Sequence, residues 1–199
     1  MQYFHIDSCY APAGKRLLEI GQTINTSSRP FNPYYEQMRD IHHVIPVGGQ
    51  ERRLKELLLS RDIEQFPSRE LANSFHGVID TYIRLLREME FENIRREQYA
   101  SRPSRTRCIW LTDSLDEAIY WRKRLSKPNG TRIVRVDVDG NLHQADGRYL
   151  SAESSSLSEL SLAAQRYWEG GLHADSEREF LLEGAMTVIA VEACESPIS

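Results

Sequence analysis

Cysteine is scarce in this sequence, and its few cysteines follow no metal-binding or disulfide pattern. Three occur among 199 residues: Cys9, Cys108 and Cys194. They are odd in number, far apart and outside any Cys-x-x-Cys pair, the spacing typical of zinc sites and thiol redox motifs. The sequence therefore predicts free thiols in a reducing compartment and no metal site.

Positive charge is also in deficit. The net charge is −4 and the sequence pI is about 5.9, whereas a protein that binds nucleic acid along its surface is usually strongly basic. This balance argues against general nucleic-acid binding and leaves room only for a local basic patch.

Long hydrophobic runs and glycine-rich phosphate loops are missing as well. No segment approaches the roughly 18 apolar residues of a membrane span, and residues 1–8 lack the basic and apolar regions of a cleaved signal. The pairs Gly48-Gly49 and Gly170-Gly171 do not fit the Gly-x-Gly-x-x-Gly spacing of a dinucleotide loop. We therefore expect a protein with no membrane partner, located in the cytoplasm or delivered into a host cytoplasm.

A chain of 199 residues with 40 % hydrophobic residues is long enough to form a single domain with one core. The two longest predicted helices lie in its first half. Residues 29–35 hold aromatics between prolines and suit a lid or a packed surface loop, of which we favour the loop. Helices are predicted over residues 50–61 and 68–99, the second with Ser68 as N-cap. Its charge-dense end, residues 84–97, is expected to be a solvated face. An apolar stripe on this helix is expected to be core and comprises Leu71, Phe75, Val78, Ile79, Tyr82, Ile83, Leu86 and Met89.

A small basic patch follows the long helix. Pro103 breaks the helical pattern, and residues 108–111 read as a strand. Guanidinium groups match phosphate oxygens, so the patch suits a phosphate-bearing ligand, with solvated surface arginines as the open alternative. Beyond the strand, Asp113 or Ser114 is predicted to cap a helix. The arginines of the patch are Arg102, Arg105 and Arg107.

The C-terminal half reads mainly as strands. Residues 131–138 alternate in polarity, and Asp139-Gly140 is predicted to form a turn after them. The serine-rich segment 151–161 is predicted to be a loop, or else the start of a helix that includes Leu160 and residues 162–164. This helix is expected to end before Tyr167, and the glycine pair that follows stops it. The last strand is predicted over residues 180–191.

The acidic start of that last strand is the most informative stretch for function. Between Ser176 and Gly184 a two-residue period puts Glu177, Glu179 and Glu183 on one face. Like charges so close repel and raise one another's pKa, so the face is either a solvated sheet edge or a carboxylate pair at the mouth of a cleft. Glu183 lies roughly 13 Å along the strand from Glu179, which predicts a structural or rim acid.

Four residues occur in an order that resembles a known enzyme family. His5 falls in a first strand, Trp110 in the strand before the capped helix, Tyr120 in that helix and Glu179 in the last strand. This order resembles the ADP-ribosyltransferase family in its His-Tyr-Glu form, with a tryptophan where that form has its tyrosine.

Longer segments carry the same resemblance. Residues 110–118 are similar to the second strand and following helix of the family, and residues 177–182 to the Glu-x-Glu strand of its toxin-like members. From residue 105 onward the chain also resembles uncharacterised bacterial and phage proteins of this fold, including Tyr167-Trp168-Glu169-Gly170. The resemblance implies one α+β domain over residues 1–199, with split mixed or antiparallel sheets and a helical insertion at about residues 50–97.

The implied activity is an NAD-dependent mono-ADP-ribosyltransferase without a metal, which passes ADP-ribose from NAD to a protein or nucleic-acid acceptor and releases nicotinamide. Ionised Glu179 would bond a ribose hydroxyl and stabilise an oxocarbenium-like sugar, and Glu177 is its conditional helper toward the acceptor. The residues expected at NAD are His5 for the adenine-side ribose, Trp110 and Tyr120 for the nicotinamide ring, Thr112, and, from its charge alone, Arg105 for the diphosphate.

Three other functions are open on the same fold. A catalytically silent member would bind a nucleotide or a protein through the helical insertion. An NAD glycohydrolase would release nicotinamide without an acceptor. An RNA 2'-phosphotransferase needs a more basic surface than this composition offers.

Overall fold

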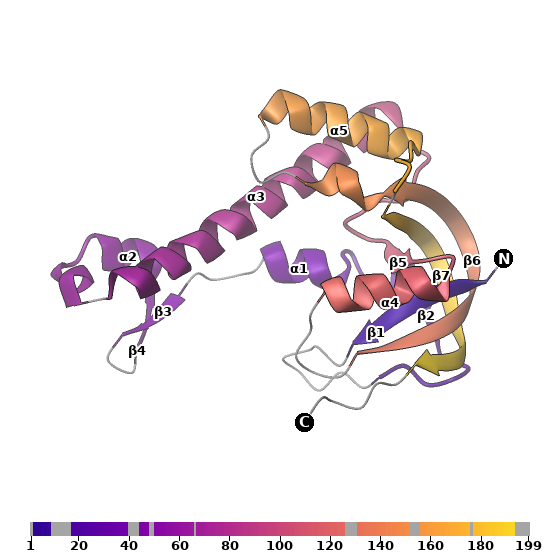
Figure 1. Ribbon diagram of the computed structural model, residues 1–199, viewed down its shortest axis with the longest axis horizontal. Coiled ribbons are helices and arrows are strands. Elements are labelled where there is room, and N and C mark those ends of the chain that lie inside the picture. Colours follow the sequence, from indigo (N-terminus) through magenta and orange to yellow (C-terminus); the bar gives the residue numbers. More distant parts are fainter. Residues whose placement is uncertain are drawn as a thin grey trace.

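Two long antiparallel strands, β6 (Thr131–Asp146) and β7 (Arg178–Ala193), lie at the centre of the computed structural model of the protein (Figure 1). They pair from Arg178 opposite Asp146 to Ala193 opposite Ile133. The structure describes residues 2–8, 17–39, 44–47, 50–65, 67–125, 131–151, 156–175 and 177–193. Helices and a wholly antiparallel sheet make up this described part, which places it in a mixed helix and strand class compatible with α+β.

Short strands flank the central pair on both sides. β1 (Tyr3–Ser8) pairs with β6, whereas β2 (Thr23–Asn25) and β5 (Ile109–Leu111) both pair with β7, so the order is β1-β6-β7-β2 with β5 also on β7. The acidic strand is therefore internal, and the solvated sheet edge considered for it is wrong. The other described elements outside the long helices are η1 (Thr26–Ser28), α1 (Pro33–Arg39), β3 (Val44–Val47), β4 (Gln50–Arg53), α2 (Leu54–Leu58), η2 (Arg61–Gln65) and η3 (Gly147–Leu150).

The central strands bend so strongly that the outer edges of the sheet meet. Phe4 of β1 and Thr112, just after β5, exchange two backbone hydrogen bonds of 2.9 Å. The predicted turn at Asp139-Gly140 is wrong, because β6 runs through it. Gly140 faces Gly184 of β7, and both have positive φ, +144° and +154°. An added Cβ on Gly140 would lie 2.4 Å from the Glu183 carbonyl oxygen, so only two glycines let the strands approach at this bend.

Helices α4 (Leu115–Arg124) and α5 (Leu157–Glu169) pack against the bent sheet. α4 is capped by Ser114, as predicted, and lies over Phe4 and Ile133. α5 begins with a capping box at Ser156 and ends at left-handed Gly170, so it includes Tyr167 and Trp168 and does not end before them. Both aromatic side chains are fully buried between α5, α3 (Ser68–Gln98) and the sheet. The opposite sheet face packs around Phe180, Leu182 and Met186.

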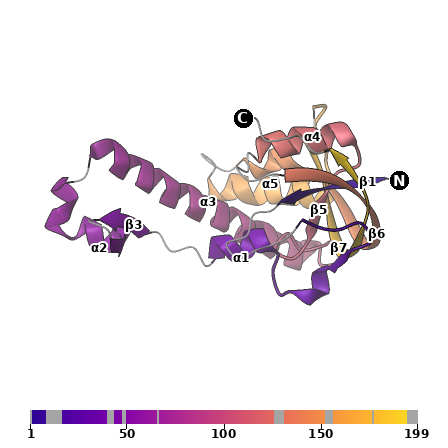
Figure 2. The same cartoon turned by 90° about the horizontal axis from the view of Figure 1, so that it is seen from below.

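The long predicted helix is confirmed as α3, but it does not lie along the core. We call the arm the set formed by β3, β4, α2, η2 and residues 68–86 of α3. Figures 1 and 2 show the arm projecting away from the sheet, while the other end of α3 packs on α5. The helix predicted over residues 50–61 is wrong in its first part, because Gln50–Arg53 pairs with Val44–Val47 as a hairpin. Pro67, not Ser68, is the N-cap, without a side-chain hydrogen bond.

The apolar stripe of α3 is core only at the tip of the arm. Leu71, Phe75 and Val78 pack against Leu57 of α2. Beyond them the stripe is exposed except for half-buried Ile83. The buried residues of α3 come from the charge-dense end that was expected to be solvated. They are Glu88, Phe91, Glu92 and Ile94.

Two expectations from the sequence concern the cysteines and the absence of a membrane-spanning segment. Cys108 is a buried free thiol, as predicted, whereas Cys9 and Cys194 lie outside the described residues. Burial raises the pKa of the Cys108 thiol well above its ordinary value. None of the described helices has both the length and the apolarity that crossing a membrane requires.

The glycine pair of the bend gives a stability test. Gly184→Ala places a Cβ 2.2 Å from the Asp139 carbonyl oxygen at φ +154°, so we expect the free energy of unfolding to fall by about 2–4 kcal/mol. Gly77→Ala is the matched control, because a Cβ at this helical position meets no atom within 4 Å and should stabilise by about 0.5–1 kcal/mol. Denaturant unfolding measures both, and equal effects would contradict the close approach of the strands.

Candidate functional site

Glu179 lies at the start of β7, almost fully buried, with one carboxylate oxygen held by two donors. Oε1 accepts a hydrogen bond of 2.5 Å from the Tyr167 hydroxyl and one of 2.6 Å from Nη1 of Arg105. No described residue bonds Oε2, and the side chain keeps 9 % of its surface accessible. The carboxylate is thus fixed in orientation through one oxygen, and its second oxygen has no hydrogen-bond partner among the described residues.

Arg105 is buried beneath this carboxylate. Its Nε donates to Glu88 Oε2 at 2.9 Å, Nη2 to Glu88 Oε1 at 3.3 Å, and Nη1 to both Tyr167 and Glu179. Burial opposes the charge of the guanidinium, but Glu88, then Tyr167 and Glu179, raise its pKa well above the ordinary value. All three nitrogens of Arg105 are occupied, so the structure places it as the holder of Glu179, away from any position open to a diphosphate.

The other members of this buried network keep definite protonation states. Burial pushes the pKa of Glu88 up, but Arg105 and then Arg87, which bonds it at 2.8 Å, outweigh burial and leave the pKa lowered. The pKa of Tyr167 is raised well above its ordinary value, by burial first and by Glu179 next, against Arg105. Tyr167 therefore stays protonated and donates to Glu179.

Trp110 and Thr112 lie on or next to β5, the neighbour of the Glu179 strand, and His5 lies on β1, which meets this segment at Thr112. Trp110 is opposite Leu181 in the β5–β7 register, so its side chain shares a sheet face with Leu181 and Glu179. The Trp110 carbonyl accepts a 2.9 Å hydrogen bond from His5 Nδ1, which fixes the tautomer of that ring. Thr112 continues the strand and is buried. The structure thus places Trp110 on the strand next to Glu179. His5, by contrast, pairs with Val134, which lies on the opposite sheet face to Ala145 and Glu179.

Helix α1 supplies the outer wall of Trp110. The Tyr34 ring meets the indole edge to face, with centroids 5.7 Å apart. Buried Asn32 anchors the helix, because its side chain accepts from the Tyr35 amide at 2.9 Å and donates to the Arg105 carbonyl at 2.7 Å. The predicted loop at residues 29–35 is therefore partly helical, and it is packed.

Tyr120 and Glu177 form a separate group at the end of α4. The Tyr120 hydroxyl donates to Glu177 Oε1 at 2.8 Å, and Arg124 bonds both side chains. Tyr120 is 43 % exposed, and no interaction among the described residues joins it to Trp110. The structure thus brings Tyr120 to Glu177 and not into an aromatic pair around Trp110.

A buried carboxylate fixes the position of Glu177. Asp146 accepts hydrogen bonds from the backbone amides of Arg148, His173 and Glu177 at 2.9–3.0 Å, and from the His173 ring at 2.8 Å. Burial alone would raise its pKa, but the bonds from His173 and Arg148 lower it, so Asp146 is ionised. Gly147 follows it, and a Cβ there would lie 2.8 Å from the Trp121 ring. These contacts hold together the ends of β6 and β7.

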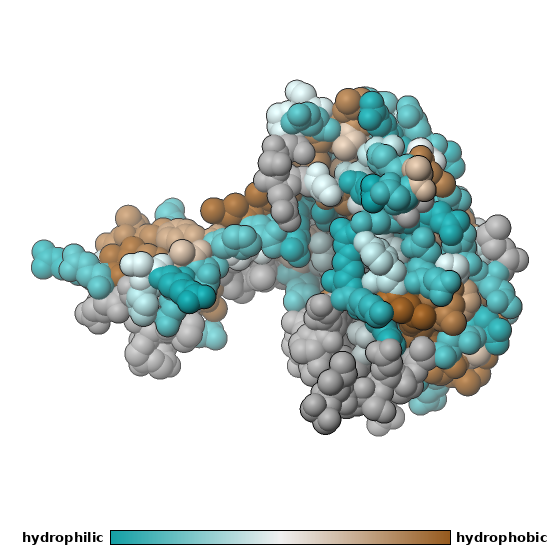
Figure 3. Space-filling model, in the orientation of Figure 1, coloured by the Kyte–Doolittle hydropathy of each residue, from teal (hydrophilic) through white to brown (hydrophobic). Residues whose placement is uncertain are grey.

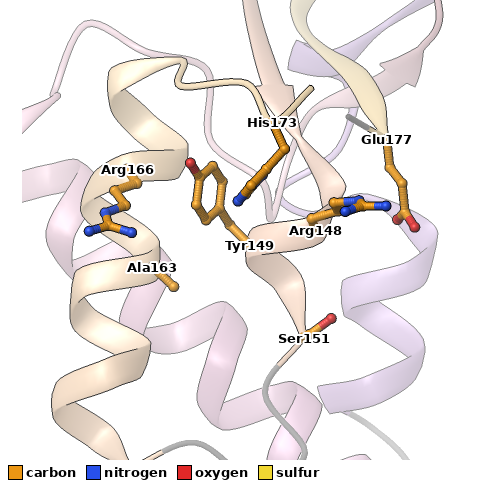
Figure 4. Close-up of a pocket in the computed structure, with 7 residues that line it drawn as sticks. All are labelled: Arg148, Tyr149, Ser151, Ala163, Arg166, His173 and Glu177. Carbon is orange, nitrogen blue, oxygen red and sulfur yellow. The ribbon is translucent and has the colours of Figure 1, made fainter. Parts of the chain in front are cut away.

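An open pocket of about 550 Å³ adjoins Glu177. Figure 4 shows Tyr149 between Arg166 and His173, with Arg148 extending toward Glu177. Arg148 also forms an ion pair with Asp175 at the surface. The lining residues are Arg148, Tyr149, Ser151, Ala163, Arg166, His173 and Glu177.

With this geometry in place, comparison with known families can be stated. A family model described as "Protein of unknown function (DUF2441)" matches residues 3–196. The chain belongs to the DUF2441 family. No curated protein matches it in sequence. The match spans the arm as well as the sheet, so this DUF2441 chain carries its long helix as a part of the family domain.

Sequence reasoning missed four residues on which the DUF2441 site depends. Glu88 and Tyr167 lie in helices, and helical periodicity does not predict contact with a carboxylate distant in the sequence. Asp146 and Arg124 lie at the ends of a strand and a helix, where many other charged residues also occur. Tyr167 stood in the segment Tyr167-Trp168-Glu169-Gly170 noted for its resemblance, and Glu88 in the charge-dense segment 84–97 that was expected to be solvated. A buried-polar pattern, such as acids within an apolar helical face, was the one available signal for Glu88.

Arg105 allows a double-variant test of the DUF2441 network. Arg105→Gln leaves Glu179 buried without its counter-charge and Glu88 with Arg87 alone, so the free energy of unfolding should fall by about 3–5 kcal/mol. Adding Glu88→Gln removes one buried negative charge and should recover part of this loss. Arg107→Gln, at an exposed neighbour, should change stability by less than about 0.5 kcal/mol. Denaturant unfolding decides, and additive losses in the double variant would argue against the network.

His143 gives the DUF2441 fold a pH dependence. Burial lowers its pKa from 6.5 to about 4, while its Nε2 lies 3.1 Å from the Tyr167 carbonyl. In the unfolded chain His143 takes up a proton as the pH falls below 6.5, whereas in the folded chain it does so only near pH 4. Its contribution to the free energy of unfolding is therefore fully present above pH 6.5 and is lost as the pH falls toward 4. The loss should reach roughly 3 kcal/mol. His143→Asn should flatten the unfolding free energy between pH 6.5 and 4.5; an unchanged slope would contradict this.

Proposed function

We propose that the protein is an NAD-dependent mono-ADP-ribosyltransferase that transfers ADP-ribose to a protein or nucleic-acid acceptor and releases nicotinamide. The observation that carries the proposal is the Glu179 carboxylate, fixed through Oε1 by Tyr167 and Arg105 with Oε2 left to a ligand. His5 and Trp110 on the adjoining strands support it, because they complete the order that the sequence resemblance implies.

Cleavage of the bond between ribose and nicotinamide requires a fixed carboxylate of this kind. When the bond between ribose C1' and the nicotinamide nitrogen breaks, its electron pair leaves with neutral nicotinamide and the sugar becomes cationic. Oε2 of Glu179 bonds a ribose hydroxyl and places negative charge beside that sugar, the electrostatic help that glycosidases also obtain from carboxylates. An acceptor atom then forms the new bond to C1' and gives up its proton.

The surrounding residues take roles that follow from where they lie. The Trp110 face binds the nicotinamide ring, and His5 bonds the adenine-side ribose. Glu177, held by Tyr120 and Arg124, faces the open pocket and orients the acceptor. Arg105 acts through Glu179 as a positioning residue, and Thr112 shapes the wall behind it.

The finer fold assignment belongs to the same proposal. The sequence resemblance implies an ADP-ribosyltransferase-like domain with split mixed or antiparallel sheets. The bend at Gly140 and Gly184, with β1 and β5 meeting at Phe4 and Thr112, supports such a split sheet. The arm is then the helical insertion.

A catalytically silent member of this fold is the second candidate. Its support is that both acids of the Glu-x-Glu pair are engaged by arginines, Glu179 by Arg105 and Glu177 by Arg124. Buried ion pairs of this kind also serve as purely structural links. Such a protein binds a nucleotide or a partner without consuming NAD.

Nicotinamide release from NAD tests the catalytic role of Glu179. Glu179→Gln keeps the shape of the side chain but removes its charge, so the rate should fall by about 100-fold or more. Glu183→Gln is the control on the same strand, because Glu183 is exposed near Arg107, and its rate should stay within about two-fold of wild type. Melting curves check that both variants fold. A Glu179→Gln protein with the wild-type rate would sink the proposal.

Labelled NAD separates the remaining activities. Incubation with a cell lysate places label on protein or on nucleic acid if the protein is a transferase. Free ADP-ribose and nicotinamide without a labelled acceptor identify a glycohydrolase. Calorimetric binding of NAD with no turnover identifies the silent member.

A further inference from the structure

Helix α3 carries a row of large apolar side chains that stay exposed. Ile79 is 56 % exposed, Tyr82 59 %, Leu86 51 % and Met89 50 %. We call these four residues the α3 face. Figure 3 shows hydrophobic residues gathered along the projecting part of the molecule. At the tip of the arm, Leu58 and Leu59 at the end of α2 are 39 % and 82 % exposed. Apolar rows of this length are unusual on a monomer surface and mark interaction sites.

The spacing of the row predicts a helical partner. Steps of three, four and three residues keep Ile79, Tyr82, Leu86 and Met89 on one side of the helix, as in a packing seam. Charged residues in this stretch point elsewhere. Asp80 and Arg84 form an ion pair of 2.7 Å away from the row, and Arg87 and Glu88 bond to each other and to the body of the domain.

We propose that the α3 face pairs with the α3 face of a second copy of this chain, with the two helices antiparallel about a two-fold axis level with residue 84. The three-four-three spacing reads the same in both directions, so this axis sets Ile79 opposite Met89 and Tyr82 opposite Leu86. Every large side chain then meets one from the other copy, as an isologous interface requires. No charge within the α3 face repels a second copy.

The exposed area is enough for such a pair. With about half of each side chain accessible, the four residues of the α3 face expose roughly 500 Å² per chain, so a symmetric pair buries about 1,000 Å², the lower bound of specific interfaces. The axis also brings the tip of each arm toward the Met89 end of the other copy.

Light scattering on the purified full chain tests the state of assembly. The wild type should have twice the 23.0 kDa mass of a single chain at micromolar concentration and dissociate on dilution. Leu86→Glu should weaken self-association by about 30-fold or more, because a charge is buried at the centre of the pair. Asn73→Glu, on the back of the same helix, should leave the dimer unchanged. A monomeric wild type, or a Leu86→Glu dimer of wild-type affinity, overturns the proposal.

Cysteine pairing tests the direction of the helices. A mixture of Ile79→Cys and Met89→Cys chains should oxidise to the mixed disulfide in excess over the two homodimers, because the axis sets residue 79 opposite residue 89. Wild-type protein supplies the background from its own cysteines. Homodisulfides of Ile79→Cys in excess would mean parallel helices and overturn the antiparallel arrangement.

Discussion

One buried charge network holds the parts of this protein in register: Glu88 of α3, Arg105 of the turn before β5, Tyr167 of α5 and Glu179 of β7. Each charge would cost several kcal/mol to bury alone, and together they are stable because every guanidinium nitrogen meets an acceptor. The network also explains the inverted character of α3. Its end against the body must supply counter-charge, so acids lie inside there, while the apolar row beyond it has no core to enter.

Local signals predicted the local structure. The alternation in β7 correctly separated the Glu179 face from the Phe180 face, and Ser114 and Gly170 marked helix ends as expected. The predictions that were wrong concerned features that depend on contacts between residues distant in the sequence. Helical periodicity assigned the stripe of α3 to the core and its charges to solvent, but Arg105, 17 residues from Glu88 and 74 from Glu179, decides which side is buried. Likewise Gly140 suggested a turn, because only its pairing with Gly184 reveals a bend.

The two acids that share a face of β7 end in different surroundings for physical reasons. Glu179 lies within the sheet, where an ionised carboxylate needs a buried cation, and its freedom is reduced to one outward oxygen. Glu177 precedes the strand, is held by its backbone amide on Asp146, and keeps its carboxylate at an open pocket. The alternation of the sequence placed the two acids on one face. Their different surroundings depend on Asp146 and Arg105, which no local sequence pattern connects to them. A reaction that needs one fixed anion and one acid near an incoming acceptor suits this difference.

Helix α3 links this site to the arm, because Glu88 and Met89 are consecutive residues of it, one buried against the body and the other exposed on the α3 face. Glu88 orients Arg105, and Arg105 orients Glu179. A constraint on Met89, such as the pairing of two arms, therefore acts on the helical turn that supplies the anchor of the buried network. The coupling must be reciprocal: a ligand that tightens Glu179 would favour the same position of α3 and so the paired state, by the same free energy. Because an α-helix is stiff over this distance, the link needs no further moving part.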